Sequence, residues 1–209
     1  RMAENILEVK HLKKYGKTAR GTRHAVDDVR FTIEKGKTLG IVGESGCGKS
    51  TTGRAILRLL EPTDGQVIFN GQDITALSSS KMRQMRRDMQ IIFQDPFSSL
   101  DPKKTVSQTI AEPIIENKIL KDKKAIDARV RELMATVGLA ERLVNAYPHE
   151  LDGGRRQRIG IARALAMEPK FIVCDEPVSA LDVSIQAQIL NLLQELKEQM
   201  GLTFIFITH

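Results

Sequence analysis

Short apolar runs along this chain alternate with longer segments in which apolar residues recur at helical spacing. The runs predict β-strands at residues 6–9, 25–33 and 38–42, because apolar and β-branched residues dominate or alternate there. A basic, glycine-containing stretch from Lys13 to Arg23 separates the first two strands and is predicted to be a loop. The chain therefore begins as a β-rich region.

Helical spacing begins immediately after the third strand and a glycine-rich turn. A helix is predicted from Lys49 to Leu60, with Pro62 ending it. From Pro96 to about Pro148, strand patterns are absent and charged helical segments take over. The clearest of these segments spans residues 122–137. This part of the chain predicts a helical insertion in an α/β domain.

Strand patterns return at residues 170–175 and 203–208, and a helical pattern over 185–200 separates them. Strands that alternate with helices favour a mostly parallel core sheet. We therefore expect a single domain over residues 1–209. Its expected parts are a β subdomain with the first part of the core over 1–95, a helical part over 96–160, and the second part of the core over 161–209.

The glycine-rich turn matches the phosphate-loop pattern G-x-x-x-x-G-K-[ST] and is followed by a threonine. Its members are Gly43, Glu44, Ser45, Gly46, Cys47, Gly48, Lys49, Ser50 and Thr51. The glycines let backbone N–H groups surround phosphates, Lys49 supplies a positive charge, and Ser50 places a hydroxyl on Mg²⁺. The predicted ligands are ATP and Mg²⁺. The predicted fold is a P-loop NTPase (RecA-like) with an N-terminal antiparallel β subdomain and an inserted helical subdomain.

The apolar run at residues 171–174 is followed by two carboxylates, Asp175 and Glu176. The carboxyl ends of strands in a parallel sheet face the ligand crevice. Asp175 is therefore predicted to hold Mg²⁺, directly or through water. Glu176 is predicted to polarise a water molecule for attack on the γ-phosphate.

Further motifs resemble those of the ABC ATPases. Residues 150–164 resemble the family's signature region, which is normally L-S-G-G-Q followed by Q-R. Gln94 resembles the Q-loop glutamine, residues 179–182 resemble the D-loop, and His209 resembles the switch histidine. Tyr15 resembles the A-loop aromatic residue that stacks on adenine. The motifs follow one another in the family's order along nearly the whole chain.

The resemblance implies roles for these residues. Gln94 would sense the γ-phosphate through Mg²⁺ or water and report to a permease. His209 would contact the γ-phosphate and position Glu176, so that Lys49, Glu176 and His209 form the expected catalytic set. Asp182 would bridge to an opposing subunit. The expected metal ligands are Ser50, Gln94 and Asp175.

Residues 92–102 are similar to the Q-loop segment of oligopeptide and dipeptide importer ATPases, although nickel importers share much of the pattern. The resemblance implies a homodimer or heterodimer of ATPase subunits beneath two membrane-spanning permeases, supplied by an external solute-binding protein. The chain would then lie at the cytoplasmic face of the membrane, attached through the permeases. The apolar runs are too short to span a bilayer, and the N-terminal residues lack the apolar core of a signal peptide.

The signature departs from the family at two positions, where Asp152 replaces serine and Arg155 replaces glutamine. In the family, this segment, here Asp152, Gly153 and Gly154, binds the γ-phosphate of the ATP held by the opposite subunit. A carboxylate about 4 Å from a phosphate costs about 4 kcal/mol at an effective dielectric of about 20. We hypothesise that Arg155 compensates for this repulsion, either by pairing with Asp152 or by binding phosphate itself. The rival hypothesis is that the signature serves a degenerate site in a heterodimer.

Composition leaves two alternative functions open. The net charge of +6 permits nucleic-acid binding, but the aromatic content of 4% supplies few stacking platforms, and no nucleic-acid partner is expected. A nucleotide-binding regulator without hydrolysis is the other alternative. The two cysteines form no disulfide framework. Cys47 is expected to be a reactive thiol near a helix N-terminus and Cys174 to be buried in a strand.

Overall fold

The computed structural model describes residues 4–42, 48–93 and 98–208 of the chain. It divides into two compact units. The first unit comprises Arg1–Gln90, Lys170–Asp175 and Lys197–His209, and the second comprises Ile91–Pro169 and Glu176–Leu196. The chain crosses between the units several times, so residues distant in sequence meet within each one.

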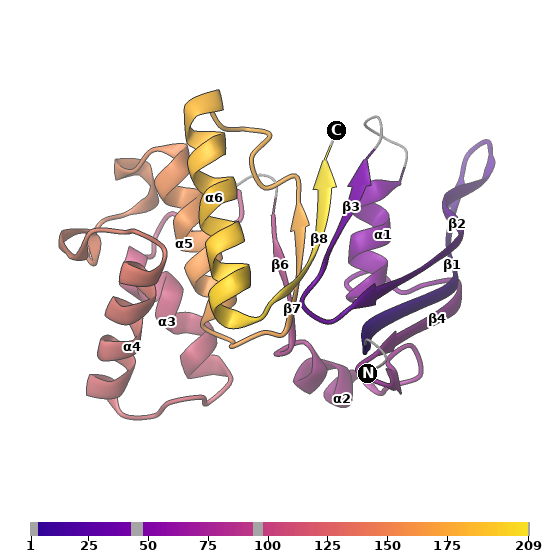
Figure 1. Ribbon diagram of the computed structural model, residues 1–209, viewed down its shortest axis with the longest axis horizontal. Helices are drawn as coiled ribbons and strands as arrows, with labels where there is room; N and C mark the ends of the chain where they lie inside the picture. The colour runs from indigo at the N-terminus through magenta and orange to yellow at the C-terminus, as the bar shows by residue number, and fades with distance from the viewer. Residues whose placement is uncertain (1–3, 43–47, 94–97, 209) are drawn as a thin grey trace. The chain divides into compact units, whose positions relative to one another are not determined.

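The first unit contains an antiparallel sheet of order β2-β1-β4-β5. Its strands are β1 (Asn5–Thr18), β2 (Gly21–Glu34), β4 (Asp64–Phe69) and β5 (Gln72–Asp73). Figure 1 shows β1 and β2 as a long hairpin. The inward residues of β1 are apolar and buried, among them Leu7, Val9 and Leu12. The N-terminal antiparallel subdomain predicted from the sequence is therefore present.

The prediction of a loop from Lys13 to Arg23 is wrong. The two strands continue to pair through this stretch, as far as Thr18 opposite Gly21, and Thr18 Oγ1 donates to the Gly21 carbonyl over 2.9 Å. Most side chains near the hairpin tip are exposed, so no apolar alternation marks these strands. Ladder hydrogen bonds join backbone groups, and they form here without the buried side chains on which the sequence prediction depends.

The second sheet has the order β3-β8-β7-β6. Its strands are β3 (Thr38–Val42), β8 (Thr203–Thr208), β7 (Phe171–Asp175) and β6 (Met89–Ile92), the last of which runs from the first unit into the second. β8 pairs in parallel with both β3 and β7. All five residues of β7 are buried, as expected for an inner strand of a parallel sheet. The parallel core sheet predicted from the sequence is confirmed.

Helix α1 (Lys49–Ile56) follows β3 and is shorter than predicted. The sequence prediction extended it to Leu60, whereas Arg58 adopts a left-handed conformation with φ of 52°. The Arg58 guanidinium donates to the carbonyls of Ile74 (3.0 Å) and Leu77 (2.8 Å), so tertiary hydrogen bonds compete with further helical turns. A short helix, α2 (Ser79–Met85), begins at the capping residue Ser78.

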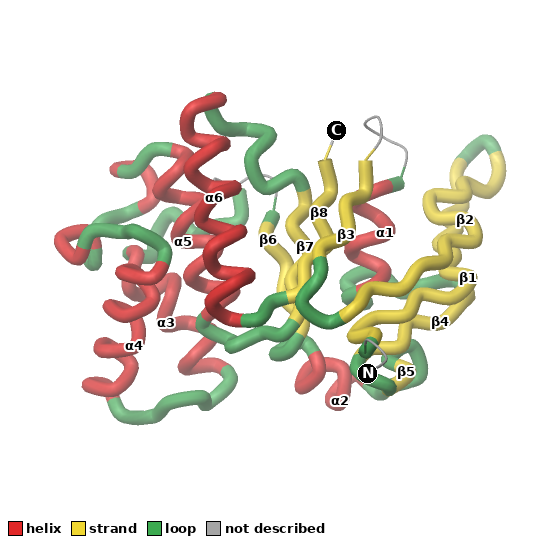
Figure 2. The backbone as a smooth tube through the Cα atoms, viewed as in Figure 1, coloured by secondary structure: helices red, strands yellow, loops and turns green. Residues whose placement is uncertain are grey.

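The second unit is helical, as Figure 2 shows for α3, α4 and α5. Its helices are α3 (Val106–Glu116), α4 (Lys123–Thr136), α5 (Gly153–Leu165) and most of α6 (Val183–Met200), with 3₁₀ turns at Glu141–Leu143 and Pro148–Glu150. The Asp122 side chain caps α4, and Gly138 follows the helix with φ of 76°. These ends agree with the helix predicted from the sequence. Buried apolar residues hold α3, α4 and α5 together, among them Ile110, Ile114, Leu133, Met134 and Ile159.

Candidate nucleotide-binding site

The start of α1 places the end of the phosphate loop against β2. Gly48 precedes the helix with φ of 88°, and a Cβ atom added to it would lie 2.0 Å from the carbonyl oxygen of Ala25. A side chain is therefore excluded both by the backbone conformation and by the contact. The other loop residues predicted to surround phosphates, Gly43, Glu44, Ser45, Gly46 and Cys47, lie outside the described residues.

Lys49 lies at the first position of α1, and only 6% of it is exposed. Its Nζ donates to the backbone carbonyl of Thr208 over 2.7 Å. Thr208 is the last residue of β8, so the ammonium group is held at the carboxyl end of the parallel sheet. This is the edge at which ligands of open α/β sheets bind. The predicted neighbour His209 lies outside the described residues.

Ser50 and Asp175 meet at the same edge of the sheet. Ser50 Oγ donates to Asp175 Oδ1 over 2.8 Å, and the Asp175 side chain is almost fully buried at the end of β7. The Arg54 guanidinium lies 3.9 Å from the second oxygen of Asp175. A hydroxyl and a carboxylate side by side are hard oxygen donors of the kind that Mg²⁺ prefers. The two residues predicted from separate sequence motifs are thus brought together.

The donor set fits a metal ion that shares its coordination with a bound nucleotide. Among residues 4–42, 48–93 and 98–208, no cluster of three or more His, Cys, Asp or Glu side chains has the arrangement of a metal site. Mg²⁺ is commonly held by one or two protein oxygens together with substrate phosphates and water. Gln94, the third predicted ligand, lies outside the described residues.

Glu176 follows Asp175 in sequence but belongs to the second unit. It is 6% exposed and has a left-handed backbone conformation with φ of 48°. Ser179 bonds to the Glu176 carbonyl twice, through its N–H at 3.3 Å and its hydroxyl at 3.2 Å. The chain therefore turns sharply after the buried strand. A strained conformation of this kind is found most often at functional sites.

The signature segment forms the N-terminus of α5. Asp152 is the helix cap, and its Oδ1 accepts a hydrogen bond from the backbone N–H of Arg155 over 2.8 Å. The Arg155 guanidinium lies 3.6 Å from the other carboxylate oxygen, and both side chains are exposed. Aspartate and serine are both favoured helix caps, so Asp152 satisfies the backbone as serine would. The ion pair with Arg155 matches the pairing hypothesised from the sequence.

The glycines of the signature pack against the segment that contains Asp182. Cβ atoms added to Gly153 and Gly154 would lie 3.0 Å from a methyl group of Leu181 and 2.7 Å from a methyl group of Ile185. Asp182 itself is exposed next to the start of α6, and its carbonyl accepts from the Gln186 N–H over 2.8 Å. Within the second unit, the structure therefore brings together the signature and the segment that contains Asp182. Both motifs were predicted to contact the opposing subunit.

Gln157 is a buried residue of α5 within the signature region, but the sequence analysis assigned it no role. Its Nε2 donates to the carbonyl of Pro177 over 2.7 Å and to the carbonyl of Phe93 over 3.3 Å. Only 1% of the residue is exposed. The signature helix is therefore bonded to the residue before Gln94 and to the residue after Glu176. The available clue was a polar residue at a position that the helical periodicity of α5 places in the interior.

Tyr15 lies within the β1–β2 hairpin. Its hydroxyl donates to Asp27 Oδ1 over 2.7 Å, and its ring stacks on His24 with centroids 4.0 Å apart. The hydrogen bond to Asp27, followed by partial burial and the charges of nearby aspartates, raises the pKa of Tyr15 to about 12. Tyr15 therefore stays neutral at physiological pH. Sequence analysis singled out Tyr15 but neither of its two partners.

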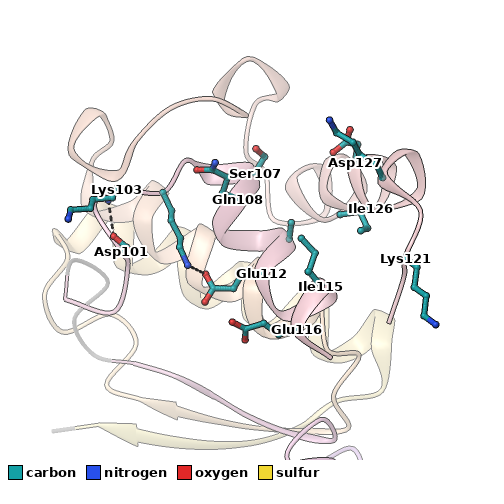
Figure 3. Close-up of a pocket in the computed structure, with 13 residues that line it drawn as sticks. Asp101, Lys103, Ser107, Gln108, Glu112, Ile115, Glu116, Lys121, Ile126 and Asp127 are labelled. Atoms are coloured by element: carbon teal, nitrogen blue, oxygen red, sulfur yellow. Dashed lines mark hydrogen bonds and ion pairs between the residues drawn. The ribbon is translucent and has the colours of Figure 1, made fainter. Parts of the chain in front are cut away.

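A separate pocket of about 890 Å³ lies in the helical unit, between α3 and α4 and the segment before α3. Figure 3 shows Glu112, Ile115 and Glu116 of α3 on one side and Ile126 and Asp127 of α4 on the other. Four lysines and four acidic residues balance the charge of its lining. None of the residues predicted to bind nucleotide contributes to it.

Within the described ranges, no helix combines the length and apolar character that crossing a membrane requires.

The first unit thus has the features of a P-loop nucleotide-binding domain: a parallel sheet, a lysine at the start of the helix after β3, and a serine–aspartate pair at the carboxyl edge. The family model described as ABC transporter matches residues 26–179. The chain therefore belongs to the ABC transporter family and is an ATP-binding domain of the ABC ATPase class. Both the fold class and the family resemblance predicted from the sequence are confirmed.

Two relatives are named oligopeptide transport ATP-binding protein OppF. That of Bacillus subtilis strain 168 is 58% identical over 209 residues, which cover 100% of this chain and 68% of the relative. That of Salmonella typhimurium is 53% identical over 188 residues, covering 90% of this chain and 56% of the relative. The chain thus spans little more than half to two thirds of the length of these relatives.

Solved structures agree with this assignment. The ATP-binding cassette MJ0796, in a dimeric post-hydrolysis state bound to ADP and Pi, has a TM-score of 0.88 and is 32% identical, with 97% of this chain and 88% of that chain covered. The protein cbiO1 of Clostridium perfringens, part of the ABC transporter complex cbiONQ, has a TM-score of 0.85 and is 30% identical, with 99% and 79% covered.

Proposed function

We propose that this chain is the ATP-hydrolysing part of an ABC importer for oligopeptides or dipeptides. The observation that carries the proposal is the arrangement of Lys49, Ser50 and Asp175 at the carboxyl edge of the parallel sheet. Lys49 is placed to neutralise phosphate charge, and Ser50 with Asp175 would hold Mg²⁺ on the nucleotide. The names of the relatives support the cargo class, since both are oligopeptide transport proteins.

Hydrolysis is assigned to Glu176, with His209 and Gln94 in supporting roles. Mg²⁺, when bound, supplies positive charge to the transferred phosphate group. Glu176 would polarise the attacking water, and His209 would orient Glu176 and contact the γ-phosphate. Gln94 would sense the γ-phosphate and report its presence. The buried carboxylate of Glu176 and its strained backbone support a functional role for this residue.

A second ATPase subunit is part of the proposal. Asp152, Gly153 and Gly154 would reach the γ-phosphate of the ATP bound by that subunit, and Asp182 would bridge to it. The dimeric structure of MJ0796 supports this arrangement. The Asp152–Arg155 ion pair supports the compensation hypothesis, because a paired carboxylate repels phosphate less than an isolated one. Either a homodimer or a heterodimer satisfies these roles.

Permease partners would attach the chain to the cytoplasmic face of the membrane and couple hydrolysis to transport. The pocket between α3 and α4 offers a surface for such a contact, because Ile115 is 56% exposed on it. An external solute-binding protein would deliver the peptide to the permeases.

The proposal is tested with Glu176→Gln in the subunit assembled with its ATPase partner. We expect ATP binding to remain while turnover falls by at least about 100-fold, the range for loss of general base catalysis. Retained turnover with normal ATP affinity would refute the catalytic role of Glu176. Peptide uptake into proteoliposomes that contain both permeases then tests the importer function.

The nucleic-acid alternative makes a different prediction. It requires tight binding that weakens steeply with salt concentration. Two arginines that add to the positive charge, Arg58 and Arg86, are engaged with backbone carbonyls inside the first unit. We therefore expect no specific binding of DNA or RNA in a titration at physiological salt concentration.

A further inference from the structure

Three side chains of the β1–β2 hairpin form a cluster that we call the ring cluster: Tyr15, His24 and Asp27. Tyr15 and His24 are direct cross-strand partners, so their side chains lie on one face of the hairpin. Their rings stack with centroids 4.0 Å apart and an angle of 22° between the planes. His24 therefore covers one face of the Tyr15 ring.

Asp27 connects to both rings. One of its oxygens accepts the Tyr15 hydroxyl hydrogen bond over 2.7 Å, and the other lies 3.7 Å from His24 Nδ1. The backbone of β1 at Tyr15 is held as well, since its N–H donates to Thr63 Oγ1 over 2.8 Å. The orientation of the Tyr15 ring is thus set at its hydroxyl, at one ring face and at its backbone.

The ring cluster lies beside the phosphate-binding end of α1. Ala25, the residue after His24, has its carbonyl oxygen against Gly48, so closely that a Cβ atom there would be 2.0 Å away. Gly48 directly precedes Lys49 and the helix N-terminus that faces phosphate. The residue next to His24 therefore contacts the glycine that directly precedes the phosphate-binding helix.

We propose that His24 and Asp27 position Tyr15 as the base-binding platform of the nucleotide site, with His24 supporting one face of its ring and Asp27 fixing its orientation. This inference rests on the proposed nucleotide site and on the adenine-stacking role that the family resemblance implies for Tyr15. Its new content is the assignment of His24 and Asp27 as positioning residues for the ring on which the purine stacks.

Preorganisation of the Tyr15 ring is the physical basis of this role. A tyrosine on an exposed hairpin loses rotamer freedom when a base stacks on it, and this loss weakens binding. The hydrogen bond to Asp27 and the stack on His24 impose that restriction before the ligand arrives. A planar purine then stacks on the other face of a ring that is already fixed in place, an arrangement that aromatic pairs prefer. A triphosphate without a base gains nothing from the platform.

A purely structural role is the competing explanation, because cross-strand aromatic pairs also stabilise hairpins. The two explanations differ in what they predict for ligands. A structural role affects every ligand of the phosphate site equally, or none of them. A platform role affects MgATP and leaves inorganic tripolyphosphate unchanged.

The chain is suited to a spectroscopic test, because it contains two tyrosines and no tryptophan. In the full chain carrying Tyr147→Phe, the tyrosine fluorescence and the tyrosinate absorbance report on Tyr15 alone. We expect MgATP to change the fluorescence of Tyr15 and tripolyphosphate to leave it unchanged. Because the hydrogen bond to Asp27 raises the pKa of Tyr15, Asp27→Asn should move its titration to lower pH. Asp28→Asn is the matched control, since Asp28 bonds to His11 and acts on Tyr15 only through its charge, so it should move the titration less than Asp27→Asn does.

Binding constants complete the experiment. His24→Ala and Asp27→Ala should each raise the dissociation constant of MgATP by about 3- to 10-fold, the range of one aromatic contact or one hydrogen bond, with the constant for tripolyphosphate unchanged. His24→Phe should restore ATP affinity. Equal affinity of His24→Ala and the parent for MgATP would overturn the inference, as would an equal loss for both ligands. Tyr15→Ala distinguishes failure of this inference from failure of the adenine-stacking role on which it rests. If Tyr15→Ala leaves ATP affinity unchanged, Tyr15 does not stack on adenine.

Discussion

Replacing Gln157 with leucine isolates the contribution of one buried side chain to the second unit. Leucine is close to glutamine in size but removes the amide that donates to Pro177 over 2.7 Å and to Phe93 over 3.3 Å. The bond to Phe93 is long and therefore weak. Most of the loss in stability then comes from the carbonyl of Pro177, a buried residue whose acceptor loses its donor. Leaving a buried acceptor without its donor costs about 1–3 kcal/mol.

We therefore expect Gln157→Leu to lower the free energy of unfolding by about 1–3 kcal/mol, measured by urea denaturation followed by circular dichroism. Gln188→Leu is the control, because Gln188 is exposed on α6 and surface substitutions usually stay within about 0.5 kcal/mol. The two variants make the same chemical change in different surroundings. If Gln157→Leu were as stable as Gln188→Leu, the hydrogen bonds of Gln157 would contribute nothing to the stability of the second unit.

Three further outcomes follow from local packing. Gly154→Ala should destabilise the chain by about 1–3 kcal/mol, because its Cβ would lie 2.7 Å from a methyl group of Ile185, and Ile185→Ala in the same chain should recover part of the loss in a denaturation series. Gly48→Ala should abolish ATP binding in a calorimetric titration while the circular dichroism spectrum stays native, since the new methyl group meets β2; retained affinity would contradict the close contact described for this residue. Burial raises the pKa of the Cys174 thiol, so iodoacetamide at pH 8 should modify the native chain once, at Cys47, and the unfolded chain twice, as counted by mass spectrometry.

The order of strands and helices was predictable because buried elements leave a periodic pattern. β7 and β8 are apolar along their length, and α4 has a capping aspartate and a terminal glycine. The long β1–β2 hairpin was missed because its outer half is exposed and leaves no such pattern. Helix α1 was predicted too long because the bonds of Arg58 to distant carbonyls end it, and those carbonyls belong to residues 16 and 19 positions further along the chain.

The residues of the candidate site also divide into those that the sequence predicted and those that it did not. Lys49, Ser50, Asp175 and Glu176 were all predicted, since phosphate and Mg²⁺ binding require particular residue types at particular places in a motif. The contributions of Gln157, His24 and Asp27 were not predicted. Each acts through a partner that is close in space through strand pairing or helix packing, and no short motif describes such a partnership.

By itself, the sequence determined the chemistry of this protein: a phosphate loop, an acidic pair after a buried strand, and the motifs of an ABC ATPase. Tertiary structure decided which groups meet. It brought Ser50 within 2.8 Å of Asp175, although 125 residues separate them, and stacked His24 on Tyr15. The physical reason is that motif residues are constrained by the ligand they bind, whereas their neighbours are chosen by the register of strands and the packing of helices.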